Sequence, residues 1–229
     1  MSSFPKVRRT VKVDDSSRKI GHVHFNPAAE NILATASGDF TIKIWDIETG
    51  TAKLTLKLGD MVQSESWSAN GSLLVTTSRD KRLRIWDVRQ ERPAHETAGH
   101  SGAKNSRTVW LGEHDRVVTT GFSKMSDRQL ALWDIRSFQE PIQGFKTLDT
   151  ISGVCMPFWD EGTQCLYLAG RGYACPYTHL KFKLGKLTRN FPVMATFATL
   201  SWTTTSSSTY QNISRENHSV GLASCPSEG

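Results

Sequence analysis

The sequence predicts an all-β protein built from repeated four-stranded antiparallel sheets, and three observations support this prediction. A Trp-Asp pair ends each of three similar segments, at spacings of 41 and 47 residues. Runs in which apolar and polar residues alternate precede each pair, as in half-buried strands. Asp and Gly residues suited to turns separate these runs. A repeat of about 40 to 45 residues that ends in Trp-Asp is typical of WD repeats, whose sheets stack radially as the blades of a β-propeller.

Each element of the repeat can be placed along the chain. The segments 32–50, 73–90 and 117–136 align as strand, polar turn, alternating strand and Trp-Asp. A further strand is expected before each, for example at 22–25 and 64–67. Asn70-Gly71 lies between two such runs, which is a strong hairpin signal. The structural Trp-Asp pairs are Trp45-Asp46, Trp86-Asp87 and Trp133-Asp134.

Polar residues at fixed places in the repeat are predicted to hold the blades together. The turn between the two aligned strands ends in Asp39, Asp80 and Asp127, and the Gly-His pair that often opens such a repeat is present once, at Gly99-His100. We expect Asp39, Asp80, His100 and Asp127 to form the polar network of the blades. In the third repeat, His100, Asp127 and Trp133 are expected to share one buried network.

The sequence shows no signature of catalysis, and an enzyme is not expected. It has no nucleophile elbow or phosphate loop. The four cysteines form no CxxC pair and are read as reduced thiols. His22 and His24 share one strand face, but no carboxylate partner lies nearby, so no metal site or cofactor is predicted. No run reaches the roughly 18 to 20 apolar residues of a membrane span.

The net charge of +6 is modest, and the first twenty residues are basic. Such a segment can contact an acidic nucleic acid, lipid or protein surface. Its composition favours a solvated, disordered tail over residues 1–17, and no nucleic-acid partner is predicted.

The residues around the repeats resemble the coronin family, the actin-filament-binding WD-repeat proteins. The resemblance covers about residues 17–172 and is carried by three stretches, of which GFSKMSDRQLALWD is the most specific part. They are SRKIGHVHFNPAAENILATASGDFTIKIWDIETG, TTGFSKMSDRQLALWDIRSFQEPI and LDTISGVCMPFWDEGTQCLYLAGRG. The resemblance implies a cytoplasmic protein of the actin cytoskeleton that binds filamentous actin through basic propeller surface. Candidate contacts are Lys81, Arg82, Arg84, Lys104, Arg107, Lys124 and Arg128, each of which could instead be ordinary solvated blade surface.

The family implies a closed propeller of seven blades followed by a linker and a coiled coil, and this sequence departs from that pattern. We expect the family's first blades and their basic surface to be absent from this sequence. No heptad repeat is visible, so no coiled coil is expected. Residues 18–172 are therefore expected to form about three and a half blades, open rather than closed, with edge strands exposed.

Residues 173–229 do not resemble the family, and a disordered, non-homologous tail is expected there. They contain no Asp and are rich in Ser and Thr. When the codons are read one base out of frame from Val193, a continuation of the coronin pattern becomes possible. Trp202 has a single codon, which makes the shifted codon that it shares with Thr203 an Asp codon. The hypothesis is that 173–192 translate a retained intron and 193–229 the next exon out of frame; a genuine divergent tail is the alternative.

Three functions remain open from the sequence. The first is actin-filament binding that regulates the cytoskeleton, compromised by truncation. The second is a generic WD-repeat scaffold for another protein partner. The third is a nonfunctional truncated product that is cleared because it exposes strand edges and apolar surface.

Overall fold

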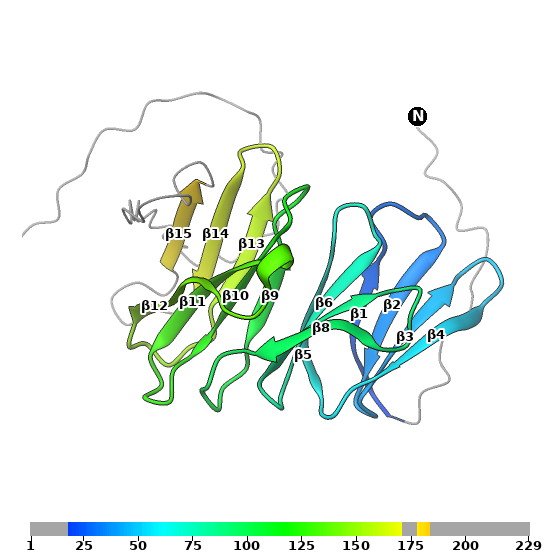
Figure 1. Cartoon of the computed structure of the whole chain (residues 1–229), viewed down its shortest axis with the longest axis horizontal. Helices are drawn as coiled ribbons and strands as arrows, with labels where there is room; N and C mark the ends of the chain where they lie inside the picture. The colour runs from blue at the N-terminus through cyan, green and yellow to red at the C-terminus, as the bar shows by residue number, and fades with distance from the viewer. Residues whose placement is uncertain (1–17, 171–177, 184–229) are drawn as a thin grey trace, which may run out of the picture. The chain divides into compact units, whose positions relative to one another are not determined.

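The structure, a computed structural model, describes residues 18–170 and 178–183. Figure 1 shows these residues as successive antiparallel sheets along the chain. The first sheet contains β1 (Ile20–Phe25), β2 (Ile32–Ser37), β3 (Thr41–Asp46) and β4 (Thr51–Lys57), and the second contains β5 (Val62–Trp67), β6 (Leu73–Ser78), β7 (Arg82–Asp87) and β8 (Pro93–Ala98). The third contains β9 (Arg107–Trp110), β10 (Arg116–Phe122), β11 (Arg128–Asp134) and β12 (Ile142–Asp149), and the fourth β13 (Met156–Asp160), β14 (Cys165–Gly170) and β15 (Thr178–Lys183).

Within each sheet the strands pair in chain order, so each sheet is one blade. In the described residues, the blades do not close into a ring, and the only helical element is the short 3₁₀ turn η1 (Ile135–Ser137). The predicted fold class, an all-β partial propeller that is open, is confirmed. None of the described residues forms a helix long and apolar enough to cross a membrane.

Apolar side chains between neighbouring blades form three core layers. Ile42 and Ile44 of the first blade pack with Trp67 and Trp86 of the second, in a layer that also holds Leu74. A second layer joins the second and third blades, and a third layer joins the third and fourth. The second strand of each four-stranded blade is buried along nearly its whole length, because it has a neighbouring strand on both sides and a blade packed on at least one face.

The hairpin predicted at Asn70-Gly71 connects β5 to β6. Gly71 has φ of +69°, a conformation that favours glycine, and a Cβ atom there would lie 2.1 Å from Oδ1 of Asn26. The Asn26 side-chain amide donates to the Gly71 carbonyl at 2.8 Å, which ties the first blade to this turn of the second.

The fourth blade differs from the sequence expectation in one respect. The expected disordered tail, 173–229, lies mostly outside the described residues, but 178–183 form β15, which pairs with β14 from Cys165↔Lys183 to Gly170↔Thr178. The physical reason lies in the local pattern, because polar and apolar residues alternate in Thr178–Lys183 as they do in a strand. Without this strand, β14 would have only β13 as a partner.

Candidate functional site

The Trp-Asp pairs fix the blades in register. Each Trp indole Nε1 donates to a Thr hydroxyl on the second strand of its own blade, at 2.9 Å for Trp45–Thr35 and Trp86–Thr76 and at 2.8 Å for Trp133–Thr119. Each Asp carboxylate lies at the end of the third strand and accepts backbone N–H groups of the following turn. These six residues thus hold the strands and the following turns in place.

The turn aspartates accept hydrogen bonds in the same way in the first two blades and differently in the third. Asp39 accepts from the backbone and hydroxyl of Thr41 at 3.1 and 2.7 Å, and Asp80 accepts from the backbone of Arg82 at 3.0 Å. Asp127 instead accepts from the Ser123 hydroxyl at 3.0 Å, inside a longer turn.

His100 is joined to Trp133 but not, in the described contacts, to Asp127. The His100 Nε2 atom lies 3.0 Å from the Thr119 hydroxyl, which also accepts from Trp133. Burial lowers the pKa of His100 to about 4, against the opposite effect of hydrogen bonds with Gln129 and Thr119, so the imidazole is neutral at pH 7. The network expected among His100, Asp127 and Trp133 therefore runs through Thr119, and the Asp127 carboxylate lies against Ser123.

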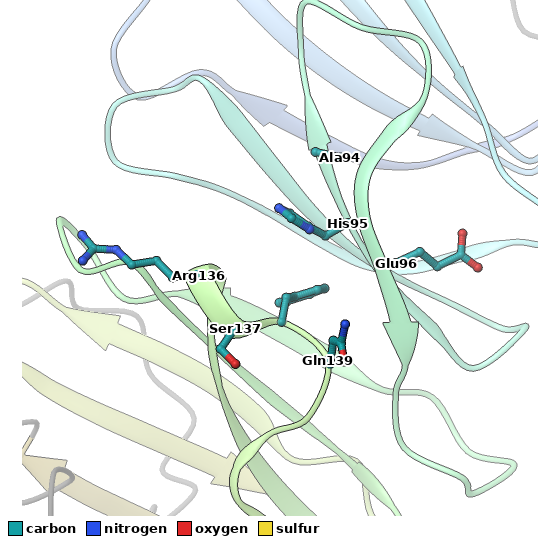
Figure 2. A pocket seen from close by; sticks show the side chains of 7 residues that line it. Ala94, His95, Glu96, Arg136, Ser137 and Gln139 are labelled. Atoms are coloured by element: carbon teal, nitrogen blue, oxygen red, sulfur yellow. The ribbon is translucent and has the colours of Figure 1, made fainter.

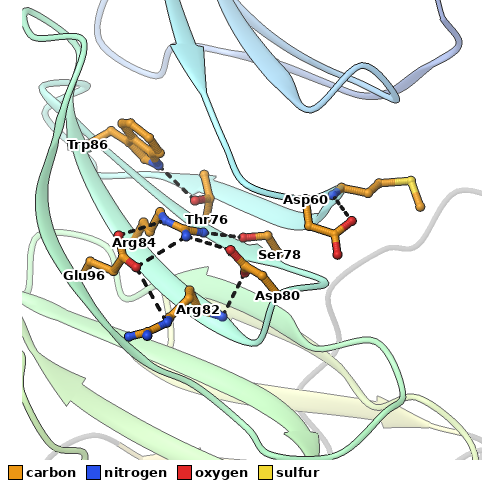
Figure 3. Close-up of polar contacts among 9 residues, drawn as sticks. Asp60, Thr76, Ser78, Asp80, Arg82, Arg84, Trp86 and Glu96 are labelled. Carbon is orange, nitrogen blue, oxygen red and sulfur yellow. Dashed lines mark hydrogen bonds and ion pairs between the residues drawn. The ribbon is translucent and has the colours of Figure 1, made fainter.

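Two of the seven candidate cationic contacts are buried inside blades. Arg84 is 8% exposed and donates to the Ser78 hydroxyl, Asp80 and Glu96 at 2.8, 2.6 and 3.2 Å, as Figure 3 shows. Burial alone would raise the pKa of Asp80, but hydrogen bonds from Arg84 and Arg82 lower it. Arg128 is 2% exposed and forms an ion pair with Asp149. Both guanidinium groups are buried and form ion pairs within their own blades, so they are not accessible to a partner.

The other candidates have more exposed positions. Lys81, Arg82 and Lys124 are exposed, while Lys104 and Arg107 are half-buried. Lys81 donates to the Ser101 carbonyl at 2.8 Å, and Arg82 lies 3.7 Å from Glu96.

Lys81, Arg82, Lys104 and Lys124 lie at one end of the blades. They precede or begin β7, β9 or β11, which are first or third strands. First and third strands of an antiparallel sheet run in the same direction, so they start at the same end. We call this end, formed by the connections into the first and third strands, the strand-start face.

The strand-start face also carries exposed apolar residues that the sequence prediction missed. Phe40, Met61 and Met125 are 40%, 43% and 83% exposed. Their sequence signal is a large apolar residue inside an otherwise polar connection. Aromatic, methionine and arginine side chains are enriched in protein interfaces, whose rims are polar.

A shallow depression of about 380 Å³ lies between β8 and η1 (Figure 2). Its charged side chains are already paired, since Glu96 contacts Arg84 and Arg136 contacts Asp115 at 2.6 Å. It therefore offers little for recognition of a charged ligand.

The described residues contain no group of three or more potential metal ligands. His22 and His24 have ring centroids 6.4 Å apart on β1. Burial, followed by the positive charges of Arg107 and His24, lowers the pKa of His22, and burial lowers that of His24. Cys155 and Cys165 are buried free thiols.

Comparisons with known proteins agree with this architecture. The family described as "WD domain, G-beta repeat" matches residues 7–46 and 53–87. The chain is 55% identical over 172 residues to coronin-like protein crn1 of Schizosaccharomyces pombe and 52% identical over 157 residues to the coronin-like protein of Saccharomyces cerevisiae. These matches cover 75% and 68% of this chain but only 29% and 24% of the two relatives.

A solved structure shows the same relationship. The WD40 domain of Toxoplasma gondii coronin superimposes with a TM-score of 0.70 at 32% identity, over 76% of this chain and 45% of that one. The chain thus shares both the repeat and the blade arrangement with coronins and spans about a quarter to a third of the curated relatives it matches first. We conclude that it belongs to the coronin family of WD40-repeat proteins.

Proposed function

We propose that this chain is a non-enzymatic, cytoplasmic protein of the actin cytoskeleton that binds filamentous actin through its strand-start face. The proposal rests on membership of the coronin family together with one observation. Exposed cations from two neighbouring blades, Lys81 and Arg82 of the second and Lys124 of the third, lie at the same end of the blades.

The chemistry of this face suits a partner with an acidic surface. Exposed cations increase the rate of association with an acidic partner and make the affinity depend on salt. The exposed Met125 beside Lys124, together with Met61, supplies apolar area that a partner could cover. Arg84 and Arg128 are excluded from the proposed contact because their guanidinium groups are buried and paired.

Cosedimentation of the full chain with actin filaments tests the proposal. We expect the chain to pellet with filaments at low salt. The variant Lys81→Asn/Arg82→Gln/Lys124→Gln should bind about tenfold more weakly, if each cation contributes roughly 0.5 kcal/mol. Asn is chosen at position 81 because Lys81 has φ of +64°, which Asn tolerates better than most residues.

The matched control removes three exposed cations from the opposite end of the blades. Arg89, Arg92 and Arg136 follow the third strands β7 and β11 and are exposed. The variant Arg89→Gln/Arg92→Gln/Arg136→Gln has the same net charge as the test variant and should pellet like the wild-type chain. Equal binding by the two variants would reject this face as the contact, and absence of wild-type binding would reject the function.

A further inference from the structure

The first strands of the four blades line a cavity of about 580 Å³. Its walls come from β1, β5, β9 and β13, and its volume is within the range of small-ligand and side-chain sites. Of the seven candidate actin contacts, Arg107 lines this cavity, whereas Lys81, Arg82, Lys104 and Lys124 of the strand-start face do not. The cavity is thus a separate feature of the fold.

Glu65 of β5 lines this cavity without a hydrogen-bond partner for its carboxyl group. The residue is 3% exposed, and neither Oε1 nor Oε2 has a partner among the described residues. The neighbouring hydroxyls are used elsewhere: Ser64 contacts the backbone of Thr108 on β9, and Ser66 accepts from the backbone N–H of Trp110 at 3.0 Å. A buried carboxyl without a donor is destabilising by about 1–3 kcal/mol, so such groups usually have a use.

The titratable and charged groups around Glu65 come from two strands. β1 contributes His22 and His24, and β9 contributes Arg107, whose Nη1 donates to the Gln63 carbonyl. The cavity-lining residues of β13, from Met156 to Trp159, carry no charge. Glu65 is therefore the only carboxylate that lines the cavity in the described part of the chain.

The remaining wall is largely apolar and aromatic. Trp67 and Trp110 are buried, whereas Met156 and Phe158 are 39% and 53% exposed. Such a surface can cover the methylene groups of a long side chain, and aromatic rings also attract a cation.

We propose that this cavity binds a lysine or arginine side chain of a partner polypeptide, with its cationic group on the Glu65 carboxylate and its methylene stem on the aromatic wall. The cation supplies both the missing hydrogen-bond donor and the opposite charge that a buried carboxylate needs. Arg107 does not fill this role: its Nη1 donates to the Gln63 carbonyl, and neither Glu65 oxygen has a hydrogen bond from it.

Binding of a cation to the Glu65 carboxylate should weaken as the pH falls. Burial raises the pKa of Glu65 to about 7, so a bound cation must displace a proton below that pH. The affinity should fall by up to about tenfold for each pH unit below 7 and level off above it. Protonation of His22 and His24 at acid pH would act in the same direction, since both would repel the cation.

Three blocked tripeptides provide the test: acetyl-Leu-Lys-Leu-amide and its Gln and Glu counterparts. Their affinities for the full chain are measured at pH 6 and pH 8 from NMR shifts of the Trp67 and Trp110 indole N–H signals. We expect the Lys peptide to bind about tenfold more tightly than the Gln peptide at pH 8, and to lose most of that preference at pH 6. The variant Glu65→Gln, which keeps size and shape, should abolish both the preference and its pH dependence.

Glu91→Gln is the control, because Glu91 is an exposed carboxylate in the connection from β7 to β8. It should leave all three affinities unchanged. Equal affinities of the Lys and Gln peptides for the wild-type chain would overturn the proposal, as would an unchanged Lys preference in Glu65→Gln. Tightest binding of the Glu peptide would show instead that Arg107 and the histidines make this an anion site.

Discussion

Two glutamates of the second blade have opposite surroundings. Glu96 is exposed on β8 and pairs with both Arg82 and Arg84. Glu65 is buried on β5 and has no hydrogen-bond partner in the described chain. Burial raises the pKa of the Glu65 carboxyl from 4.5 to about 7.

Replacement of Glu65 should change how stability depends on pH. The folded chain holds this proton more tightly than the unfolded chain, so the stabilising contribution is full below about pH 4.5 and is lost as pH rises through 7. We expect Glu65→Gln to remove that loss and to raise the free energy of unfolding at pH 8 by roughly 1–3 kcal/mol. Urea unfolding at pH 6, 7 and 8 measures the effect. A difference between variant and wild type that stays constant over this range would contradict it.

Removal of an acidic partner should lower the free energy of unfolding much more at a buried arginine than at an exposed one. Arg128 is 2% exposed and pairs with Asp149, whereas the side chain of Arg136 is 81% exposed and pairs with Asp115. We expect Asp149→Asn to lower the free energy of unfolding by roughly 2–4 kcal/mol, because a buried charge loses its counterion. Asp115→Asn is the matched control and should cost less than about 1 kcal/mol. Denaturant unfolding compares the two, and equal effects would contradict the buried pair's role.

Within the blades, the strands and their Trp-Asp pairs could be predicted because they depend on local patterns. Alternation identifies strand faces, and the repeat spacing identifies equivalent positions. The burial of Arg84 and Arg128 could not be predicted in this way. Their partners Glu96 and Asp149 lie 12 and 21 residues away on neighbouring strands, and no local pattern reports that pairing.

In the third blade, a small insertion in the turn between β10 and β11 makes the sequence alignment of the turn aspartates misleading. In the first two blades the residue after the turn aspartate has positive φ, 68° at Phe40 and 64° at Lys81. In the third blade the residue of positive φ is Ser126, which precedes Asp127. The longer turn therefore directs the Asp127 carboxylate to Ser123, although Asp127 aligns with Asp39 and Asp80 in the sequence.

The Trp–Thr hydrogen bond should contribute to each blade's stability, and the second blade is suited to a test. Thr76 is fully buried, and Trp86 is 1% exposed. We expect Thr76→Val to cost roughly 1–3 kcal/mol, because the indole N–H is left buried without an acceptor. In a double-mutant cycle, Trp86→Phe should lose less stability in the Thr76→Val background than in the wild type. Strict additivity would mean that the bond contributes no coupling.

At the scale of the whole chain, the sequence identified the cationic residues of the candidate actin contact but not the face on which they lie. The sequence singled out seven cations. Six of them precede or begin a first or third strand, but only Lys81, Arg82 and Lys124 are exposed there. The apolar residues Phe40, Met61 and Met125 at that face were missed because isolated apolar residues in turns have many causes.

Binding to filaments should weaken with salt if these cations form the contact. Between about 50 and 200 mM salt, the Debye length shortens and exposed charges are screened. We expect the wild-type affinity to fall several-fold over this range, with a shallower fall for Lys81→Asn/Arg82→Gln/Lys124→Gln. Cosedimentation at several salt concentrations gives both slopes. Parallel slopes would argue for contact elsewhere.

The hypothesis on residues 173–229 can be tested on the transcript. We expect cDNA sequenced across codons 165–200 to lack the segment between codons 172 and 193 in its dominant form, and to continue in the coronin-like frame. Retention of the segment in every transcript would mean that β15, which lies within it, belongs to the true fourth blade.

The indole-to-hydroxyl bond repeated in three blades has a consequence for folding errors. A slip of one residue between the second and third strands would send the tryptophan to the other side of the sheet and separate it from its threonine. A misaligned hairpin therefore loses its bond before any neighbouring blade has docked. The bond therefore favours the correct strand pairing within each repeat. This disfavours the exchange of strands between similar repeats of one chain.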